Sequence, residues 1–502
     1  MEIWHILLKI RTQSDDCFQH HWKCKELGIL NLCFADDVLI FCAGTINSVR
    51  TIKATLMMEF AAMSGLYVNP GKSTIILSKS VRRDRQGIID LMGFQEGSLP
   101  IKYLGVPLTS SRLTTTDCQP LLDKFAQRLA GWNHLTLSFA GRTQVIKSVL
   151  SSLHIYWASA FMLPKSIIRN VERKMREFLW KGSSASGCAK VSWAQVCKPK
   201  EQGGLGIRSV LHMNQAMMMK HVWRILQRDN QSLWVAWVNR LWTDPWHPRG
   251  LLLSWFPRGP VITGLPADSL LCTVMHQGQW CWPPSRRVEV QGIVAELPPI
   301  GPQPSDVITW KSGKFNTKSV LSMIQPASSH VLWHHLLGGK FKIPRHDFVL
   351  WLALWGRLST MDRIRISCSD VECILCGGRF LETHAHLFFE CSFSKRCIDI
   401  LKARVRFQWL QAGWDQDIIW ASRRWRGKHL INAASRALLA SIVYYIWRER
   451  NNRRFSATAS PAEAVALRAL EEVRCRIIVA KCKPTLQLHV LYRIWKIPWD
   501  RP

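Results

Sequence analysis

Hydrophobic and polar positions follow two different periods within the first part of the chain. The stretch LCFADDVLIF at 32–41 has two apolar runs around a polar pair, which predicts strand, tight turn and strand. The next apolar residues recur at helical spacing until Gly65, a residue that typically ends a helix. A turn is then expected at Asn69–Gly71, before a second extended stretch at Thr74–Leu77. This first domain, over 1–80, should therefore combine a small sheet with a helix.

Helical spacing dominates the following part, residues 81–228. Its clearest apolar stripes lie at 117–132, 139–164, 167–182 and 213–226. Residues 229–307 lack a clear period and are rich in proline and glycine, so we predict an irregular linker or a loosely structured module there. A compact region over 308–405 and a basic helical region over 406–502 complete the chain. The expected fold class is α+β, mainly α, with the sheet near the N-terminus.

Composition adds a strong positive charge to this picture. The 502 residues include 67 Lys and Arg against 35 Asp and Glu, which gives a formal net charge of +32. A protein this basic usually binds a polyanion, most often nucleic acid, although a generally basic surface is the alternative. With 47% apolar residues, the chain can bury sizeable cores.

The 16 cysteines are expected to be reduced thiols, with a metal site among them, and not a disulfide framework. The N-terminal residues do not read as a cleavable signal, because Glu2, His5 and Lys9 interrupt the apolar positions. No uncharged run approaches the length that spans a bilayer. We therefore expect an intracellular protein, nuclear or cytoplasmic, without a membrane partner.

The polar pair in the first hairpin is a candidate cation site. Asp36 and Asp37 would lie together at a rigid turn, where two like charges repel unless a positive charge is present. Mg²⁺ prefers carboxylate and phosphate oxygens and is the natural candidate. The alternative is a polar hairpin turn that happens to contain two aspartates.

A second candidate site lies in CILCGGRFLETHAHLFFEC. Cys373 and Cys376 have the C-x₂-C spacing that points two thiolates at one ion, and His386 and Cys391 follow within the same short segment. Three cysteines and one histidine make a closed tetrahedral site, which is typical of structural Zn²⁺. His384 could replace His386, which we favour because it lies closer to Cys391. Four unrelated reduced residues are the alternative.

The order of these motifs resembles a known family. LCFADDVLIF, SGLYVNPGKS, IKYLGVPL, FAGRTQVIKSVL and KEQGGLGIRSV look like the reverse transcriptase of plant LINE-type (non-LTR) retrotransposons. FNTKSVL, FVLWLALWGRLSTMDRI and CILCGG…ETHAHLFFEC resemble the zinc-binding domain that follows that polymerase. The resemblance covers most of the chain and is weakest at 229–307.

This resemblance implies RNA-templated DNA synthesis with two Mg²⁺ ions, and RNA and DNA as partners. By similarity, Asp36 and Asp37 are the magnesium-binding pair and Phe34 holds the aromatic position of that motif. Lys72 matches a lysine near the primer–template and the incoming nucleotide. The four residues of the second site match the zinc ligands. The five ranges become a partial palm with the FADD hairpin, a helical thumb or connection, a linker, the zinc-binding domain and basic C-terminal helices.

The sequence also departs from that family. The family has another metal-binding aspartate on an earlier palm strand and fingers that hold the nucleotide, whereas only a few dozen residues precede Asp36. Met1 then corresponds to an internal methionine of a longer frame. We expect a truncated polymerase, catalytically incomplete alone, with association with complementary retroelement proteins. The competing hypotheses are a non-catalytic zinc-containing nucleic-acid-binding protein and a frame without a selected role.

Overall fold

The computed structural model of the chain divides into two compact units. Unit 1 comprises residues 1–113 and 217–320, and unit 2 comprises residues 114–216 and 321–502. The structure describes residues 2–22, 24–25, 28–133, 136–181, 188–226, 242, 247, 249, 252–267, 269, 271–276, 279–285, 287–297, 315–325, 328–364, 371–378, 380–480 and 482–498. Helices predominate, with four two-stranded sheets over these residues, so the expected mainly helical α+β class is confirmed.

The N-terminal part of unit 1 contains three of the four sheets. Its elements are α1 (Glu2–Ser14), β1 (Asn31–Phe34), β2 (Asp37–Ile40), α2 (Ile46–Lys53), α3 (Ala61–Ser64), β3 (Thr74–Ile75), α4 (Arg85–Met92), β4 (Gln95–Glu96), β5 (Ile101–Tyr103) and β6 (Val106–Leu108). Strands β1 and β2 pair antiparallel from Asn31–Ile40 to Phe34–Asp37, as the apolar pattern predicts. A π-helical segment, Ala54–Phe60, joins α2 to α3, and Gly65 ends this long helix at φ 69°. The expected strand at Thr74–Leu77 is shorter than predicted.

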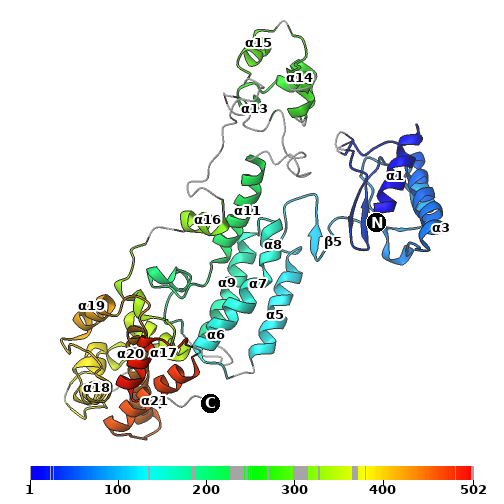
Figure 1. The fold of residues 1–502 in the computed structure, drawn as a ribbon. Helices are drawn as coiled ribbons and strands as arrows, with labels where there is room; N and C mark the ends of the chain where they lie inside the picture. Colours follow the sequence, from blue (N-terminus) through cyan, green and yellow to red (C-terminus); the bar gives the residue numbers. More distant parts are fainter. Residues whose placement is uncertain are drawn as a thin grey trace. The chain divides into compact units, whose positions relative to one another are not determined.

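Two small cores hold this part together. Helix α1 lies along the α2–α3 helix (Figure 1), where the Trp4 and Phe60 rings meet edge to face at 5.7 Å. Trp4 and Leu8 are buried there with Phe18, Leu30 and Ile52. The second core lies between α2 and α4. The hairpin is therefore fixed on one face by helices, while Phe34 at its turn is 61% exposed.

The described part of 217–320 has its own core; over much of this range the sequence predicts an irregular linker or a loosely structured module. The elements here are the end of α11 (Val210–Leu226), α13 (Leu252–Trp255), α14 (Gly259–Thr263), β7 (Met275–His276), β8 (Gln279–Trp280), α15 (Val288–Ala295) and the start of α16 (Thr317–Ile324). The buried residues are Trp242, Leu252, Phe256, Val274, Val290 and Ile293. Burial of large aromatic side chains compensates here for the short elements.

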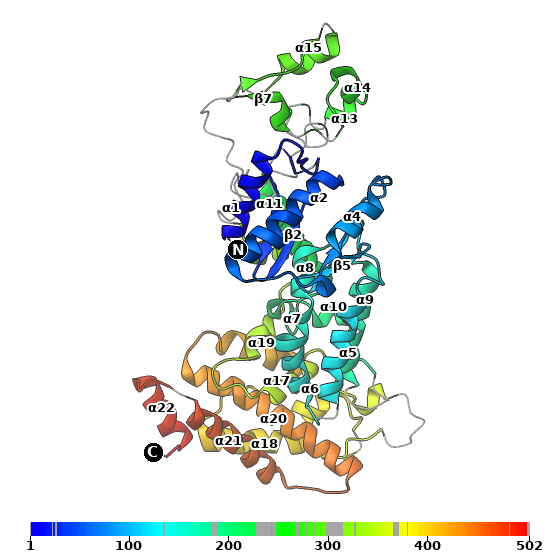
Figure 2. The same ribbon diagram turned by 90° about the vertical axis from the view of Figure 1, so that its right-hand side faces the viewer.

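Unit 2 is helical. Its helices are α5 (Gln119–Asn133), α6 (Phe139–Val145), α7 (Ser151–Leu153), α8 (Ile155–Ala160), α9 (Lys165–Trp180), α10 (Trp193–Val196), the start of α11, α17 (Pro344–Leu354), α18 (Ser392–Val405), α19 (Trp414–Arg424), α20 (Leu430–Phe455), α21 (Ala462–Val479) and α22 (Leu486–Trp495). Helices α5, α6, α7 and α9 form one bundle, and α17, α18, α20, α21 and α22 form another (Figures 1 and 2). The rings of Phe139 on α6 and Phe348 on α17 stack at 5.3 Å and join the two bundles.

The loop KPKEQGGLGIRSV packs against α17 as a tight turn. The indole N–H groups of Trp351 and Trp355 both donate to the carbonyl oxygen of Gly203, at 2.8 and 2.9 Å. A Cβ at Gly204 would lie 1.9 Å from the carbonyl oxygen of Lys198, so only glycine fits this close approach. The loop is thus a packing element between the two bundles of unit 2.

Helix α20 is the central helix of the second bundle. By length and composition alone it could cross a membrane, but 67% of its most apolar window is buried inside the protein. It runs beside α17 and α21 and also contacts α18 and α22 (Figure 2). A buried core helix passes the same test for a membrane span, and this packing accounts for the apolar residues of α20 without one.

Buried His154 makes the stability of unit 2 sensitive to acid. Its ring is 2% exposed beside Phe125, and burial lowers its pKa to about 4 from 6.5. A histidine with a lowered folded-state pKa is neutral in the folded protein and must be charged at low pH. Stability is therefore retained above pH 6.5 and falls as the pH falls towards 4, by up to about 3 kcal/mol from this residue.

This prediction is checked by urea unfolding of the wild type and His154→Gln at pH 7, 5.5 and 4.5. The variant should lose less stability between pH 7 and 4.5 than the wild type. Protonation of other groups contributes equally to both proteins, so the difference between the two slopes reports His154. Parallel slopes for the two proteins would show that His154 is not the acid-sensitive residue.

Candidate metal centre

The segment 371–391 forms a compact knuckle in unit 2. Cys373 donates its backbone N–H to the carbonyl oxygen of Phe380 at 2.9 Å, and Glu382 donates to the carbonyl oxygen of Val371 at 2.9 Å. Between them the chain turns back at Gly377, whose φ of +58° favours glycine. This short antiparallel pairing places Cys373 and Cys376 on the same side of the turn, as the C-x₂-C spacing predicts.

The other half of the knuckle comes from the start of α18. His386 begins a single π-helical turn, His386–Glu390, and Cys391 donates its N–H back to the His386 carbonyl oxygen at 2.7 Å. Cys391 is the residue that precedes the first turn of α18. The π-turn brings His386 and Cys391 to one point although five positions separate them.

The structure brings all four predicted zinc ligands together. One ligand atom from each of Cys373, Cys376, His386 and Cys391 lies within 4.8 Å of the others. The Cys373 and Cys391 sulfurs are 3.9 Å apart, and the Cys376 sulfur is 3.5 Å from the His386 Nε2. A tetrahedral zinc ion, with Zn–S bonds of about 2.3 Å and Zn–N bonds of about 2.0 Å, requires about 3.8 Å between sulfurs and about 3.5 Å between sulfur and nitrogen. The donor set therefore fits zinc.

Burial and the helix terminus shape the electrostatics of this site. Cys373, Cys391 and His386 are buried, and Cys376 is half-buried. The hydrogen bond from the Cys373 thiol lowers the pKa of Cys391, and the backbone N–H groups of Ser394 and Phe393 at the start of α18 lower it further. The same hydrogen bond, with burial, raises the pKa of Cys373. A thiolate is thus stabilised at the N-terminus of α18, where the helix dipole favours negative charge.

The two histidines that the sequence leaves as alternatives lie in different surroundings. The His384 ring packs against Trp414 with 4.3 Å between centroids and against Phe388 at 5.1 Å. Burial lowers its pKa to about 4, so it is a neutral core side chain. His386, in contrast, faces Cys376. The geometry therefore favours His386 as the fourth ligand.

A buried ion pair fixes the knuckle to α20. The Arg450 guanidinium donates to both carboxylate oxygens of Glu382, at 2.6 to 3.1 Å, and the two side chains are 1% and 0% exposed. The Glu382 carboxylate also accepts the backbone N–H of Met361 at 3.1 Å. Glu382 lies between the two halves of the knuckle in the sequence, so this pair holds both halves against one helix.

Two more arginines at the end of α20 bind the knuckle backbone. Arg453 donates to the carbonyl oxygen of Leu375 at 3.0 Å, inside the C-x₂-C turn, and Arg454 donates to that of Glu372 at 3.3 Å. Arg453 is oriented by Glu449 at 2.8 Å. The sequence shows these arginines only as part of a basic helical region, and no local signal marks their partners more than sixty positions away.

The acidic corner of unit 1, the pair Asp36 and Asp37, is exposed, unlike the buried cysteine–histidine cluster. Asp36 and Asp37 lie exposed at the β1–β2 turn, next to exposed Phe34. Lys72 is exposed in the short helical turn Pro70–Lys72. Among the described residues, no third acidic, histidine or cysteine side chain joins the two aspartates in a cluster that could hold a metal ion. Over the described residues, the structure thus assembles the four predicted zinc ligands but adds no third ligand group to the two aspartates.

Comparison with known families agrees with this knuckle. Residues 315–397 match the family described as zinc-binding in reverse transcriptase. This segment is a reverse-transcriptase zinc-binding domain. The matched range begins just before α16, ends within α18 and includes all four residues of the cluster.

Similar proteins extend the relation beyond the zinc-binding domain. An Arabidopsis thaliana protein described as a ribonuclease H protein is 40% identical over 26% of this chain and 21% of its own length. An uncharacterized mitochondrial protein of Arabidopsis thaliana is 36% identical over 16% of this chain and 54% of its own length. A 149 kDa protein of the Xenopus laevis transposon TX1 is 24% identical over 42% of this chain and 16% of its own length.

Together with the zinc-binding domain, these relatives support a relation between this chain and reverse-transcriptase-related retroelement proteins, as its motifs imply. The chain spans between about a sixth and about half the length of these relatives.

Proposed function

We propose that this chain is a nucleic-acid-binding part of the RNA-directed DNA polymerase of a non-LTR, LINE-type retrotransposon. The observation that supports this proposal most directly is the Cys373–Cys376–His386–Cys391 cluster inside a reverse-transcriptase zinc-binding domain. The formal net charge of +32 adds to it, because a phosphate backbone attracts such a protein strongly. RNA and DNA are then its partners.

The zinc-binding domain has a structural role in this proposal. Four protein ligands close the coordination of a tetrahedral ion, which leaves no position for a water molecule or a substrate. Zinc, when bound, cross-links the C-x₂-C turn to the start of α18. The protein residues around it, mainly Glu382 and Arg450, hold the same segments to the helical core. The domain is therefore a rigid base for neighbouring basic surfaces.

The Asp36–Asp37 pair supports a relation to polymerases, but it does not support polymerase activity of this chain alone. Asp36 and Asp37 would bind Mg²⁺, while Phe34 and Lys72 would face the primer–template or the nucleotide. Two-metal catalysis requires several fixed carboxylates, and loss of one can cost orders of magnitude in rate. The described residues provide two exposed aspartates at this corner. We therefore propose that the chain alone does not polymerise DNA.

Primer extension on poly(rA)/oligo(dT) with Mg²⁺ tests this part of the proposal. The purified chain should extend the primer no more than its Asp36→Asn/Asp37→Asn variant does. The variant is a matched control because both aspartates are exposed, so the exchange leaves the core intact. Robust extension by the wild type that disappears in the variant would contradict catalytic incompleteness and would establish a complete polymerase site.

Exposed apolar side chains in the N-terminal part of unit 1 favour association with a complementary retroelement protein. Ile3 and Ile6 on α1 are 62% and 55% exposed, and Tyr67 after α3 is 81% exposed. Over the part of the chain that the structure describes, the strands β1 and β2 pair only with each other, so their outer edges are open there. A partner that adds strands and carboxylates here would complete both the sheet and the magnesium site at Asp36 and Asp37.

The second candidate function is a non-catalytic zinc-containing nucleic-acid-binding protein. The observation in its favour is the contrast between an assembled Cys₃His cluster and two aspartates that no other described ligand group joins. Binding to RNA and DNA should weaken steeply between 50 and 200 mM salt, because phosphate contacts release counterions. Affinity that does not change over this salt range would contradict nucleic-acid binding under either proposal.

A further inference from the structure

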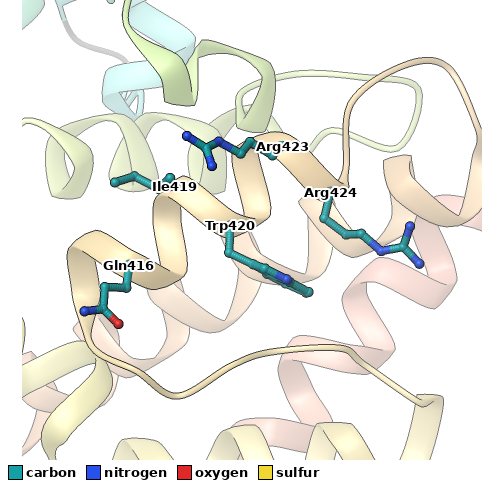
Figure 3. Close-up of a pocket in the computed structure, with 5 residues that line it drawn as sticks. All are labelled: Gln416, Ile419, Trp420, Arg423 and Arg424. Atoms are coloured by element: carbon teal, nitrogen blue, oxygen red, sulfur yellow. The ribbon is translucent and has the colours of Figure 1, made fainter.

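Helix α19 has a basic, partly aromatic surface outside the zinc-binding domain. Gln416, Ile419, Trp420, Arg423 and Arg424 line an open hollow of about 590 Å³ on this helix. These positions follow the i, i+3, i+4, i+7, i+8 spacing, so their backbone positions share one broad side of α19, from which the side chains extend in two directions. Figure 3 shows that Trp420 and Arg424 extend in similar directions, while Ile419 and Arg423 extend the other way. All five come from a single helix of unit 2.

The Trp420 ring is held in place by other tryptophans. It meets the Trp409 ring edge to face at 6.4 Å and the Trp425 ring at 5.7 Å. Trp409 and Trp425 are buried, whereas Trp420 is half-buried. A half-buried aromatic ring in a fixed orientation presents stacking area to a ligand with little further loss of side-chain entropy.

From Gln416 to Lys428, the exposed charged side chains are all positive. Arg423 and Arg424 are exposed, and the recorded ion pairs of the described residues include neither of them. Lys428 follows shortly after and is exposed as well. The acids of α19 are Asp415, exposed in its first turn, and Asp417, which is buried. In contrast, Arg450 and Arg453 on α20 form ion pairs with Glu382 and Glu449.

We propose that this α19 surface binds single-stranded nucleic acid. An unpaired base stacks on Trp420, and the flanking phosphates contact Arg423 and Arg424. Stacking platforms between cations are how proteins bind single strands without reading sequence, whereas the bases of a duplex are not available to a ring on a helix surface. The inference rests on the proposed nucleic-acid binding and assigns one part of it to a defined surface.

The test uses the full chain and a fluorescein-labelled oligo(dT) of about 16 nucleotides, with fluorescence anisotropy at several salt concentrations. Arg423→Gln/Arg424→Gln should lower the slope of log K against log salt by about 1.4, since each phosphate contact on a single strand contributes about 0.7. Trp420→Leu, which keeps an apolar side chain against Trp409, should weaken binding by about 5- to 100-fold with little change of slope.

A matched control removes two exposed arginines from α21, Arg468→Gln/Arg476→Gln, which changes the net charge equally. This control should change the slope by much less than the α19 variant does. Zinc content and melting temperature of each variant verify that it is folded. Cross-linking with an oligonucleotide that contains 4-thiothymidine gives an independent result: the labelled peptide should fall within residues 414–429.

The outcomes separate this inference from the proposed function. If the wild type binds neither RNA nor DNA, the proposed function is wrong and the α19 inference falls with it. If the wild type binds but the α19 variants bind equally well, the inference alone is wrong and another surface is responsible. Binding that prefers a duplex and is indifferent to Trp420→Leu would also overturn the inference.

Discussion

Replacing Cys391 by serine is expected to remove zinc from the chain and to unfold the knuckle together with the start of α18. Cys391 is fully buried, and its sulfur lies 3.9 Å from that of Cys373. It also connects the π-turn of His386 to the first turn of α18, so its loss releases both halves of the site. Structural zinc in small domains supplies about 10–16 kcal/mol of apparent binding free energy at pH 7, and most of this is folding free energy.

Metal analysis and hydrogen exchange measure this result. The wild type should contain about one zinc per chain, whereas Cys391→Ser, or Cys373→Ser with Cys376→Ser, should contain none. Amide protection should disappear over 371–405. Cys475→Ser on α21 is the matched control, because that thiol is exposed and distant from the cluster in the sequence. If the Cys391→Ser protein still contained about one zinc per chain and its amide protection were unchanged, Cys391 would not be a ligand.

Local sequence patterns predict the parts of this structure that depend on residues close together in the chain. The β1–β2 hairpin follows from the apolar runs around Asp36 and Asp37, and the end of the α2–α3 helix follows from Gly65. The zinc cluster is also local, because all four members lie within nineteen consecutive positions. Ligands that are close in the sequence can reach one ion through only a few backbone conformations. Residue type and spacing are therefore enough to predict the cluster.

Interactions between distant segments could not be predicted in the same way. The sequence shows Arg450 as one of several arginines at the end of a helix, and such a run usually lies on a solvated surface. Its partner Glu382 is 68 positions away, and only the packing of α20 against the knuckle brings the two together. The choice between His384 and His386 likewise depends on Trp414, which fills the space around His384. The π-turn that aims His386 at Cys376 has no sequence signal that we recognise.

The buried pair has a measurable consequence for stability. Arg450→Met should lower the free energy of unfolding by about 3–5 kcal/mol, because it leaves the Glu382 carboxylate charged, buried and short of partners. The long apolar side chain of methionine keeps much of the packing against Trp447 and Phe455. Urea unfolding followed by circular dichroism measures the change. Arg448→Met, at an exposed position of the same helix, should change stability by less than about 0.5 kcal/mol.

A double-mutant cycle with Glu382→Gln then separates the pair from the zinc site. Removing both charges should cost clearly less than the sum of the two single exchanges, because neither partner is left as an unpaired buried ion. Zinc content should stay near one per chain in all three variants, since neither side chain is a member of the cluster. Additive costs would mean that the two residues act independently. Loss of zinc from Arg450→Met would instead mean that α20 is needed to close the metal site, which would make the ion pair and the cluster one cooperative element.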